Sequence, residues 1–176
     1  MNKLLILLML SVAFAISANA QVAKMSSVFT NMSVDCKAES KVEADEVPLI
    51  CKAVGGYRLR IVPAGAWAES LEIVDKKGET IASLGTHGYG FSTAKNKKLE
   101  WRMANGKPFA VILRINKYNS EKANEDGDNP FLAKYKIGEA LMIKGLDGHS
   151  QIEFEIDGKE KNANVKAQKK ADENFQ

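Results

Sequence analysis

The chain has 176 residues, of which 25 are lysine or arginine and 22 are aspartate or glutamate, so the formal net charge is only +3. A charge that is so small and so mixed argues against a nucleic-acid partner, which favours a strongly basic face. The length suits one domain with a sizeable core.

Residues 1–20 have the pattern of a secretory signal peptide. Lys3 gives a positive start, residues 4–16 are apolar, and an Ala-Asn-Ala cleavage signal ends at Ala20. The apolar stretch is too short for a comfortable bilayer span, which takes about 20 residues. We therefore expect cleavage after Ala20 and a periplasmic or secreted mature protein without a membrane span. A retained membrane anchor is the alternative that the cleavage signal disfavours.

Residues 21–35 are small and polar without a sustained period, so we expect a flexible lead-in before a single domain over residues 36–176. Cys36 and Cys51 are the two cysteines of the chain. An exported protein meets an oxidising compartment, where such a pair usually forms a disulfide. A redox or metal-binding pair is disfavoured, because the spacing is not Cys-x-x-Cys and no histidine lies nearby.

The segment after a Gly-Gly bend alternates as a β-strand does. Tyr57, Leu59 and Ile61 share one face, while Arg58 and Arg60 share the other. Two further short strands are expected in the segments SLEIVD and TIASLG, which are separated by a glycine-containing turn. These three strands predict the first part of an antiparallel sheet.

A glycine-rich segment, GTHGYGF, follows the third of these strands. It carries His87 and Tyr89, which make it a possible interaction loop for a ligand or another protein. A plain strand-to-strand connection is the other interpretation, since connections of both kinds run over the surface.

The dipeptide Asn105-Gly106 is the one preferred in two-residue type I′ hairpin turns. Such a turn predicts two successive cross-strand pairs, Ala104 with Lys107 and Met103 with Pro108. The second pair is not hydrogen-bonded, so the proline removes no bond from the ladder. The hairpin is the strongest local signal in the sequence.

Continued without interruption, this register places Trp101 opposite Ala110 and Arg102 opposite Phe109. Neighbours on a strand alternate, so the tryptophan points to the core and the arginine to the opposite face. We therefore expect Trp101 to be structural, and the two residues not to form one site.

The second strand of the hairpin is apolar on both faces, which indicates that both faces are covered. The side chains expected to need a second cover are Phe109, Val111 and Leu113. The segment ANVKAQKKADENF is the best candidate for it. It predicts a helix over about residues 163–174, capped by Asn162 or Asn164. Its small-residue stripe comprises Ala163, Ala167 and Ala171.

Further strands are expected in FLAKYKI, ALMIKGL and SQIEFEIDG, after a polar loop of turn-forming residues. About six to eight strands closed by one C-terminal helix predict a mainly β (α+β) fold. The two architectures that fit are an antiparallel sandwich and a partly open barrel.

Neither a metal site nor a catalytic motif is indicated. His87 and His149 lie far apart and belong to no cluster of metal-ligating residues. The loop NEDGDNP lacks the glycine and glutamate positions of a calcium loop. No nucleophile motif occurs, although a pair of carboxylates that forms only in space stays open. We expect no cofactor and no enzymatic activity.

The four arginines all fall in expected strands, beside aromatic or large aliphatic residues: Arg58, Arg60, Arg102 and Arg114. A planar guanidinium fork suits an anion-binding patch on the sheet. It equally suits internal ion pairs, with Glu72 and Glu100 as candidate acids. For Arg102 we expect stacking on Phe109 or a pair with Asp172 near the end of the helix.

The chain resembles a group of small exported bacterial proteins of unassigned function. The matching residues are Gly55-Gly56-Tyr57, Glu100-Trp101-Arg102, Gly106, Pro108, Ala110, Ile112, Arg114, Ala163-Asn164, Ala167 and Ala171-Asp172. The resemblance implies an exported single domain and adds no activity. Members of the group carry two further cysteines, roughly where this chain has Leu141 and Gln176, so a second link to the last helix is missing here.

Together these features predict an exported, non-enzymatic binding or interaction module of the cell envelope. Its partner is unknown, with an envelope protein or an anionic ligand as the options. An inhibitor of a cell-wall hydrolase is the first alternative, by analogy with other small exported β-proteins that have one disulfide. A small periplasmic enzyme is the second, and it requires a pocket with convergent carboxylates.

Overall fold

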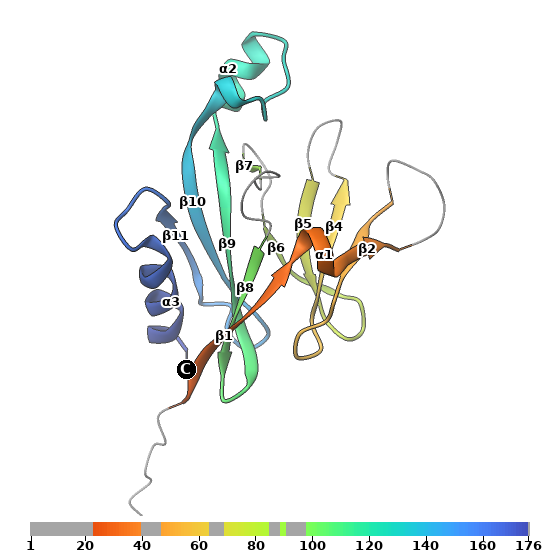
Figure 1. Cartoon of the computed structure of the whole chain (residues 1–176), viewed down its shortest axis with the longest axis vertical. Coiled ribbons are helices and arrows are strands. Elements are labelled where there is room, and N and C mark those ends of the chain that lie inside the picture. Colours follow the sequence, from red (N-terminus) through yellow and green to blue (C-terminus); the bar gives the residue numbers. More distant parts are fainter. Residues whose placement is uncertain (1–22, 40–46, 64–68, 85–88, 91–97, 176) are drawn as a thin grey trace, which may run out of the picture.

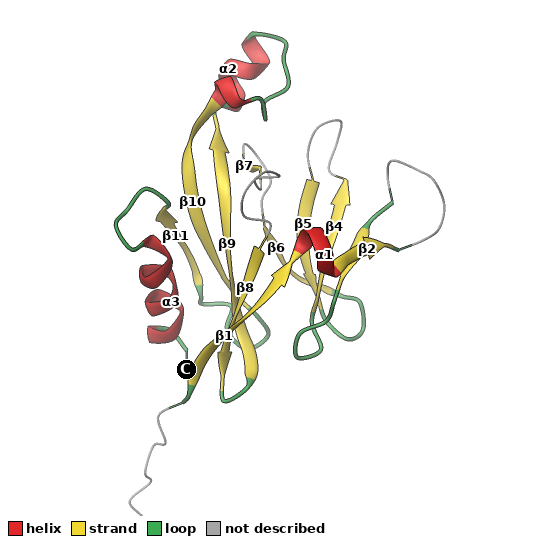
Figure 2. Cartoon of the chain, viewed as in Figure 1, coloured by secondary structure: helices red, strands yellow, loops and turns green. Residues whose placement is uncertain are grey.

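The structure is a computed structural model that describes residues 23–39, 47–63, 69–84, 89–90 and 98–175 (Figure 1). It is mainly β, with two antiparallel sheets and a C-terminal helix (Figure 2), as the sequence predicts for a sandwich. The six-stranded sheet has the order β1 (Met25–Asn31), β8 (Lys98–Ala104), β9 (Lys107–Tyr118), β10 (Lys136–Gly145), β11 (Glu153–Asp157), and β7 (Tyr89–Gly90) also pairs with β9. The five-stranded sheet has the order β2 (Cys36–Ala38), β3 (Leu49–Cys51), β4 (Arg58–Pro63), β5 (Glu69–Val74), β6 (Thr80–Leu84).

Four short or medium helical segments complete the described part: α1 (Met32–Asp35), α2 (Ser120–Glu125), the 3-10 helix η1 (Ala133–Tyr135) and α3 (Ala163–Glu173). Helix α3 occupies most of the range expected for the C-terminal helix. Within the residues that the structure describes, no helix is long and apolar enough to cross a membrane.

Two hydrophobic cores lie on opposite faces of the six-stranded sheet. The first is formed between the sheets and includes Leu59, Leu71, Ile73, Leu84, Leu99, Trp101, Val111, Leu113 and Ile115. The second is formed between the six-stranded sheet and α3 and includes Phe109, Ala110, Ile112, Leu141, Ile143, Ile152, Ala163, Ala167 and Ala171. Strand β9 contributes to both cores, which is why its sequence is apolar on both faces.

The flexible lead-in predicted for residues 21–35 is wrong from Met25 onward. Strand β1 pairs with β8 along its whole length, and α1 follows it directly. The polar residues of β1 do not indicate a strand in the sequence, because their hydrogen-bond partners lie far away in the chain. The indole Nε1 of Trp101 donates to Thr30 Oγ1 at 2.8 Å, and Arg102 Nη1 donates to Ser27 Oγ at 2.5 Å.

The expected disulfide between Cys36 and Cys51 is confirmed. The two cysteines face each other across the pairing of β2 with β3, so the bond joins the edge strand of the five-stranded sheet to its neighbour. Closure of a loop with a sequence separation of 15 stabilises a fold by about 3 kcal/mol in the chain-entropy model.

The predicted hairpin turn is present, with positive φ angles of 51° at Asn105 and 80° at Gly106. The first two cross-strand pairs are also as expected, Ala104 with Lys107 and Met103 with Pro108. The type I′ turn therefore sets the register for the first residues of both strands.

Beyond these pairs the predicted register is wrong, because β9 contains a bulge. Arg102 lies opposite Ala110, and Trp101 lies opposite Val111, so Phe109 is the extra residue. The carbonyl of Phe109 accepts a hydrogen bond from the N–H of Leu146, at 2.8 Å, which gives the bulged peptide a partner outside the hairpin.

The bulge also changes which residues the C-terminal helix covers. Phe109 and Ala110 both contribute to the core beneath α3, whereas Val111 and Leu113 contribute to the core between the sheets. The prediction that α3 covers Val111 and Leu113 is therefore wrong, while it holds for Phe109.

The expected asparagine cap of α3 is not formed. Asn162 occupies the cap position with φ 60° and ψ 32°, and its side chain makes no capping hydrogen bond. A capping side chain needs an extended backbone at that position, so the left-handed conformation explains the difference. The Oδ1 atom of Asn164 instead accepts a hydrogen bond from Arg114 Nη2 at 2.8 Å.

Strands β9 and β10 extend past β8 and β11 as an arm (Figure 1), and β7 pairs with β9 at Asn116 and Lys117 within it. Strands β9 and β10 remain paired as far as Tyr118 and Lys136, and residues 119–135 form the tip of the arm. Strand β8 ends its pairing with β9 at Leu113, well before the tip. The arm is therefore the most prominent projection of the described chain.

Candidate binding pocket

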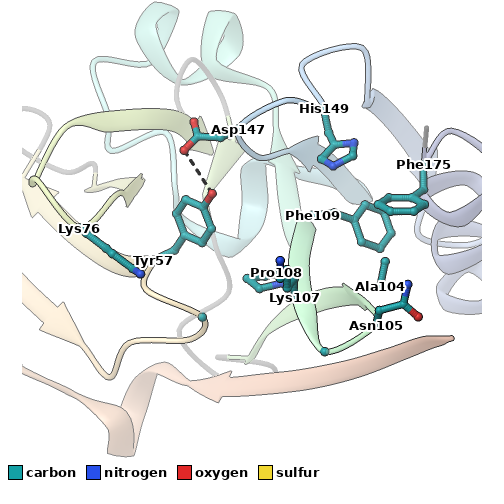
Figure 3. Close-up of a pocket in the computed structure, with 12 residues that line it drawn as sticks. Tyr57, Lys76, Ala104, Asn105, Lys107, Pro108, Phe109, Asp147, His149 and Phe175 are labelled. Atoms are coloured by element: carbon teal, nitrogen blue, oxygen red, sulfur yellow. Dashed lines mark hydrogen bonds between the residues drawn. The ribbon is translucent and has the colours of Figure 1, made fainter. Parts of the chain in front are cut away.

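A pocket of about 590 Å³ lies where the hairpin tip, the turns before β4, β6 and β11, and the end of α3 meet (Figure 3). It is lined by Gly55, Tyr57, Lys76, Ala104, Asn105, Gly106, Lys107, Pro108, Phe109, Asp147, His149 and Phe175. These residues come from five separate segments of the chain, so the pocket is a product of the tertiary fold.

A close backbone approach shapes one wall of the pocket. Gly55 has φ +59°, and a Cβ atom placed there would lie 2.4 Å from the Cδ atom of Pro108. A side chain at this position would therefore meet the proline ring, in addition to straining the backbone. The glycine allows the turn before β4 to lie against the start of β9, which joins the two sheets beside the pocket.

Three rings form the apolar wall. Phe109 lies on β9, His149 lies in the turn between β10 and β11, and Phe175 follows α3 (Figure 3). The Phe109 and Phe175 centroids are 4.8 Å apart, and the His149 ring stacks on Phe175 at 5.1 Å with an interplanar angle of 27°. The rings fix the end of the chain against the hairpin, because such contacts add to the burial of their area.

The opposite wall is polar. Tyr57 donates its hydroxyl hydrogen to Asp147 Oδ2 at 3.1 Å, as Figure 3 shows. Burial raises the pKa of the Tyr57 hydroxyl, and the hydrogen bond to Asp147 and its negative charge raise this pKa further. The phenol is therefore a neutral donor at physiological pH.

Two exposed lysines, Lys76 and Lys107, give the pocket its positive charge. No described carboxylate forms an ion pair with either of them, although twelve other pairs occur in the described chain. The Nδ1 atom of His149 is also buried without a hydrogen-bond partner among the described residues. The pocket thus combines ring surfaces with two lysines that have no ion-pair partner in the described part of the chain.

The structure does not bring the four arginines together as one anion-binding patch. Arg60 is paired with Glu72, to which its Nη2 donates at 2.6 Å, as one of the two sequence interpretations expects. Arg58, on the same strand, is exposed. Arg102 and Arg114 instead lie on the face of the other sheet that α3 covers.

Arg102 forms the centre of a polar network beneath the helix. Its Nη2 atom donates to Asp172 Oδ2 at 2.6 Å, and its Nε atom donates to Asp172 Oδ1 at 3.0 Å. Glu100 Oε1 lies 3.7 Å from Arg102 Nη1 and accepts hydrogen bonds from Ser27 and Gln168. The predicted pair of Arg102 with Asp172 is therefore present, and the arginine is structural.

Arg114 holds the other end of α3. Its guanidinium donates to Glu139, to the carbonyl of Gly158 and to the side chain of Asn164, at 2.8–3.1 Å. Hydrogen bonds from Lys136, and next from Arg114, lower the pKa of the Glu139 carboxyl. The two arginines of the six-stranded sheet thus serve the docking of α3.

The interaction loop expected around His87 and Tyr89 is described only in part. His87 lies outside the described residues, and Tyr89 belongs to β7, which pairs with Lys117 and Asn116 of β9. The backbone of Tyr89 therefore belongs to the sheet rather than to a connecting loop.

The tip of the arm is closed by its own contacts. Tyr135 is buried there and donates to Asp126 at 2.8 Å, and Lys134 forms an ion pair with Asp128 at 2.6 Å. Hydrogen bonds from Lys122 and Tyr135 lower the pKa of Asp126, and a hydrogen bond from Lys134 lowers that of Asp128. The tip is therefore a defined acidic structure.

Comparison of the chain with protein-family models, with curated proteins and with solved structures finds no match. Among the described residues there is also no group of three or more His, Cys, Asp or Glu side chains able to hold a metal ion. The pocket and the arm are therefore the two features of the described chain that bear on its function.

Proposed function

We propose that the protein is an exported, non-enzymatic binding module of the cell envelope, and that the pocket beside the hairpin tip is its binding site. The observation that carries the proposal is a three-ring wall beside two lysines, Lys76 and Lys107, that form no ion pair with a described carboxylate. The leader-like residues 1–20 and the disulfide support a periplasmic or secreted location.

The ligand class follows from the two walls. Ring faces favour an apolar, flat or aliphatic body, because they bury large area with little loss of side-chain freedom. Lys76 and Lys107 favour an anionic group at the mouth, where each provides three donors and a full positive charge. We therefore propose a small anion with an apolar body as the ligand.

The polar groups of the pocket favour binding over hydrolysis. Among the described residues that line it, Asp147 is the one carboxylate and is already hydrogen-bonded to Tyr57, so these residues supply no second carboxylate for an acid–base pair. The described lining residues include no serine, threonine or cysteine. The hydroxyl of Tyr57 and the carboxylate of Asp147 can instead orient a bound molecule through hydrogen bonds.

Anilinonaphthalene sulfonate, a fluorescent anion with an apolar body, tests the site. We expect saturable binding, weakened about fivefold by the double change Lys76→Gln with Lys107→Gln, since each exposed ion pair contributes up to about 1 kcal/mol. Phe175→Ala should weaken binding by a similar factor through loss of the ring. Lys37→Gln with Lys98→Gln is the matched control, because it removes the same charge from exposed positions that do not line the pocket.

Fluorescence titration of the four proteins, each checked for folding by circular dichroism, measures these effects. Equal affinity in the wild type, the pocket lysine variant and the Phe175 variant would show that the pocket does not bind the anion. Equal weakening by both lysine variants would assign the effect to overall charge and reject the site.

The arm favours a second candidate function, inhibition of a cell-wall hydrolase. An inhibitor of this kind presents a rigid projection that enters the substrate cleft of its target. The tip has four acidic and two basic side chains, namely Glu121, Glu125, Asp126, Asp128, Lys122 and Lys134. Leu132 in the tip and Ile137 next to it are exposed large apolar residues. The arm thus offers a closed acidic tip with apolar anchors.

A shortened arm tests this candidate. Tyr118 and Lys136 are cross-strand partners, so replacement of residues 119–135 by Asn-Gly gives a two-residue hairpin turn. If the arm inhibits, about 10 μM wild-type protein should slow the clearing of a bacterial cell-wall suspension by lysozyme several-fold, and the shortened protein should not. Unchanged clearing in the presence of the wild type would contradict an inhibitory function towards this enzyme.

A further inference from the structure

Strand β1 is an exposed edge of the six-stranded sheet. It pairs with β8 on one side, and no described strand pairs with it on the other. Its sequence, MSSVFTN, contains no charged residue and no proline, and its pairing with β8 shows no bulge. Charged residues, prolines and bulges normally protect the edge strands of proteins, and β1 has none of them. Its edge is therefore open to pairing with another strand.

Two large apolar side chains are exposed on this edge strand, with 42% of Val28 and 55% of Phe29 accessible. They are neighbours, so they point to opposite faces of the sheet. Val28 lies on the face of Thr30, which contacts the buried Trp101, while Phe29 lies on the face of Ser27, which contacts Arg102. A strand added beside β1 would cover apolar surface on both faces.

The direction of the backbone groups follows from the hydrogen bonds at the start of the strand. The N–H of Asn105 donates to the carbonyl of Lys24 at 3.0 Å, so the peptide groups of Lys24 point towards β8. Successive residues of an antiparallel strand alternate in this respect. The groups of Met25, Ser27 and Phe29 therefore point outwards, to the free side of the edge.

Helix α1 limits the open part of the edge. The N–H of Asn31, which also points outwards, donates to Asp35 Oδ2 at 2.7 Å and is not available. The free stretch is therefore Met25–Phe29, with Ser27 at its centre. The outward backbone groups of Met25 and Phe29 lie at equal spacing on either side of Ser27. A twofold axis requires this arrangement.

We propose that the occupant of this edge is a second copy of the chain, paired antiparallel through β1. Ser27 faces Ser27 across the twofold axis, and Met25 of each copy faces Phe29 of the other. All the outward N–H and C=O groups of the three residues then have partners, which joins two six-stranded sheets into one continuous sheet.

The side chains are complementary in this register. Phe29 packs against Met25 of the second copy on the α3 side of the sheet, a sulfur–aromatic contact that covers the exposed ring. Val28 lies opposite Ser26 of the second copy on the other face, as a pair that is not hydrogen-bonded. No like charges face each other between Met25 and Phe29, because this stretch carries none.

The charges that flank the strand also fit. Exposed Lys24 precedes β1, and Asp35 lies at the end of α1 beside Asn31. In an antiparallel pair, Lys24 of one copy lies opposite Thr30 of the other, one residue from Asn31 and its bound carboxylate. Opposite charges thus meet at both ends of the interface, while a parallel arrangement would place like charges together.

Sedimentation velocity of the exported protein, from about 1 to about 500 μM, tests the assembly. We expect a monomer–dimer equilibrium for the wild type. Phe29→Pro should raise the dissociation constant at least tenfold, because it removes one outward N–H without removing a bond to β8. Val165→Lys is the control, because it changes an exposed apolar residue on α3, away from β1. It should leave dimerisation unchanged.

The register has its own test. Ser26→Cys and Val28→Cys are made separately, and the two proteins are mixed under mild oxidation. Facing residues of a non-hydrogen-bonded pair have Cα atoms about 4.5 Å apart, within the range of a disulfide. We expect a cross-linked heterodimer in the mixture and much less cross-linking in either protein alone.

A wild type that stays monomeric over the whole concentration range would overturn the proposal. So would a dimer that Phe29→Pro does not weaken, or a mixture that gives no more cross-linking than the separate proteins. Retention of the wild-type circular dichroism spectrum by Phe29→Pro confirms that a loss of dimer is not a loss of fold.

Discussion

Trp101→Ala is expected to lower the free energy of unfolding by about 4 kcal/mol, which is a large part of the stability of a domain of this size. Trp101 is completely buried in the core between the sheets. The substitution leaves a cavity there, and it also leaves the Thr30 hydroxyl without the indole donor. Strand β1 should therefore become less firmly bound to β8.

Urea unfolding followed by far-ultraviolet circular dichroism measures this loss. Trp101→Phe is the matched variant, because it keeps most of the ring and removes the hydrogen bond to Thr30. It should cost about 1–2 kcal/mol, well below the alanine variant. An alanine variant as stable as the wild type would be incompatible with a buried indole at this position.

The face of each hairpin residue next to the turn could be predicted from the sequence, but the register farther along could not. Alternation alone places Trp101 in one core and Arg102 on the opposite face, and the structure agrees. At the bulge, the carbonyl of Phe109 accepts a hydrogen bond from Leu146, which lies 37 residues later in the chain. A local pattern has no information about that contact.

Strand β1 shows a second limit of the sequence. Thr30 and Ser27, whose side chains lie on opposite faces of the sheet, are typical of a loop when their partners are unknown. In the fold they receive hydrogen bonds from Trp101 and Arg102, which explains why this segment forms a strand. The same contacts explain why a short polar segment lies firmly on the sheet. Burial of polar groups is tolerated here because each has a partner.

The pocket could not be predicted as a site. Tyr57 and Phe175 are far apart in the sequence, and only the docking of α3 and the packing of the two sheets bring them to one cavity. The Gly-Gly bend and the Asn-Gly turn were the available signals, since both mark places where the backbone approaches another segment. Neither signal indicates the lysines or the histidine.

Arg102→Ala should lower the free energy of unfolding by about 3–4 kcal/mol, because loss of one partner from a buried ion pair leaves the other acids without compensation. Only 6% of Arg102 and 8% of Glu100 are accessible to solvent. Asp172 then loses its two-pronged hydrogen bonds, which fix the last turn of α3 to β8. Arg102→Lys keeps the charge but not the fork, and should cost about 2 kcal/mol.

Arg60→Ala is the matched control, because Arg60 makes a similar pair with Glu72 at a more exposed place on the five-stranded sheet. It should cost only about 1 kcal/mol. Hydrogen exchange locates the effect: Arg102→Ala should accelerate exchange in residues 163–172, and Arg60→Ala should not. Unchanged exchange in α3 after loss of Arg102 would mean that the ring contacts of Phe175 and the alanine stripe hold the helix without it.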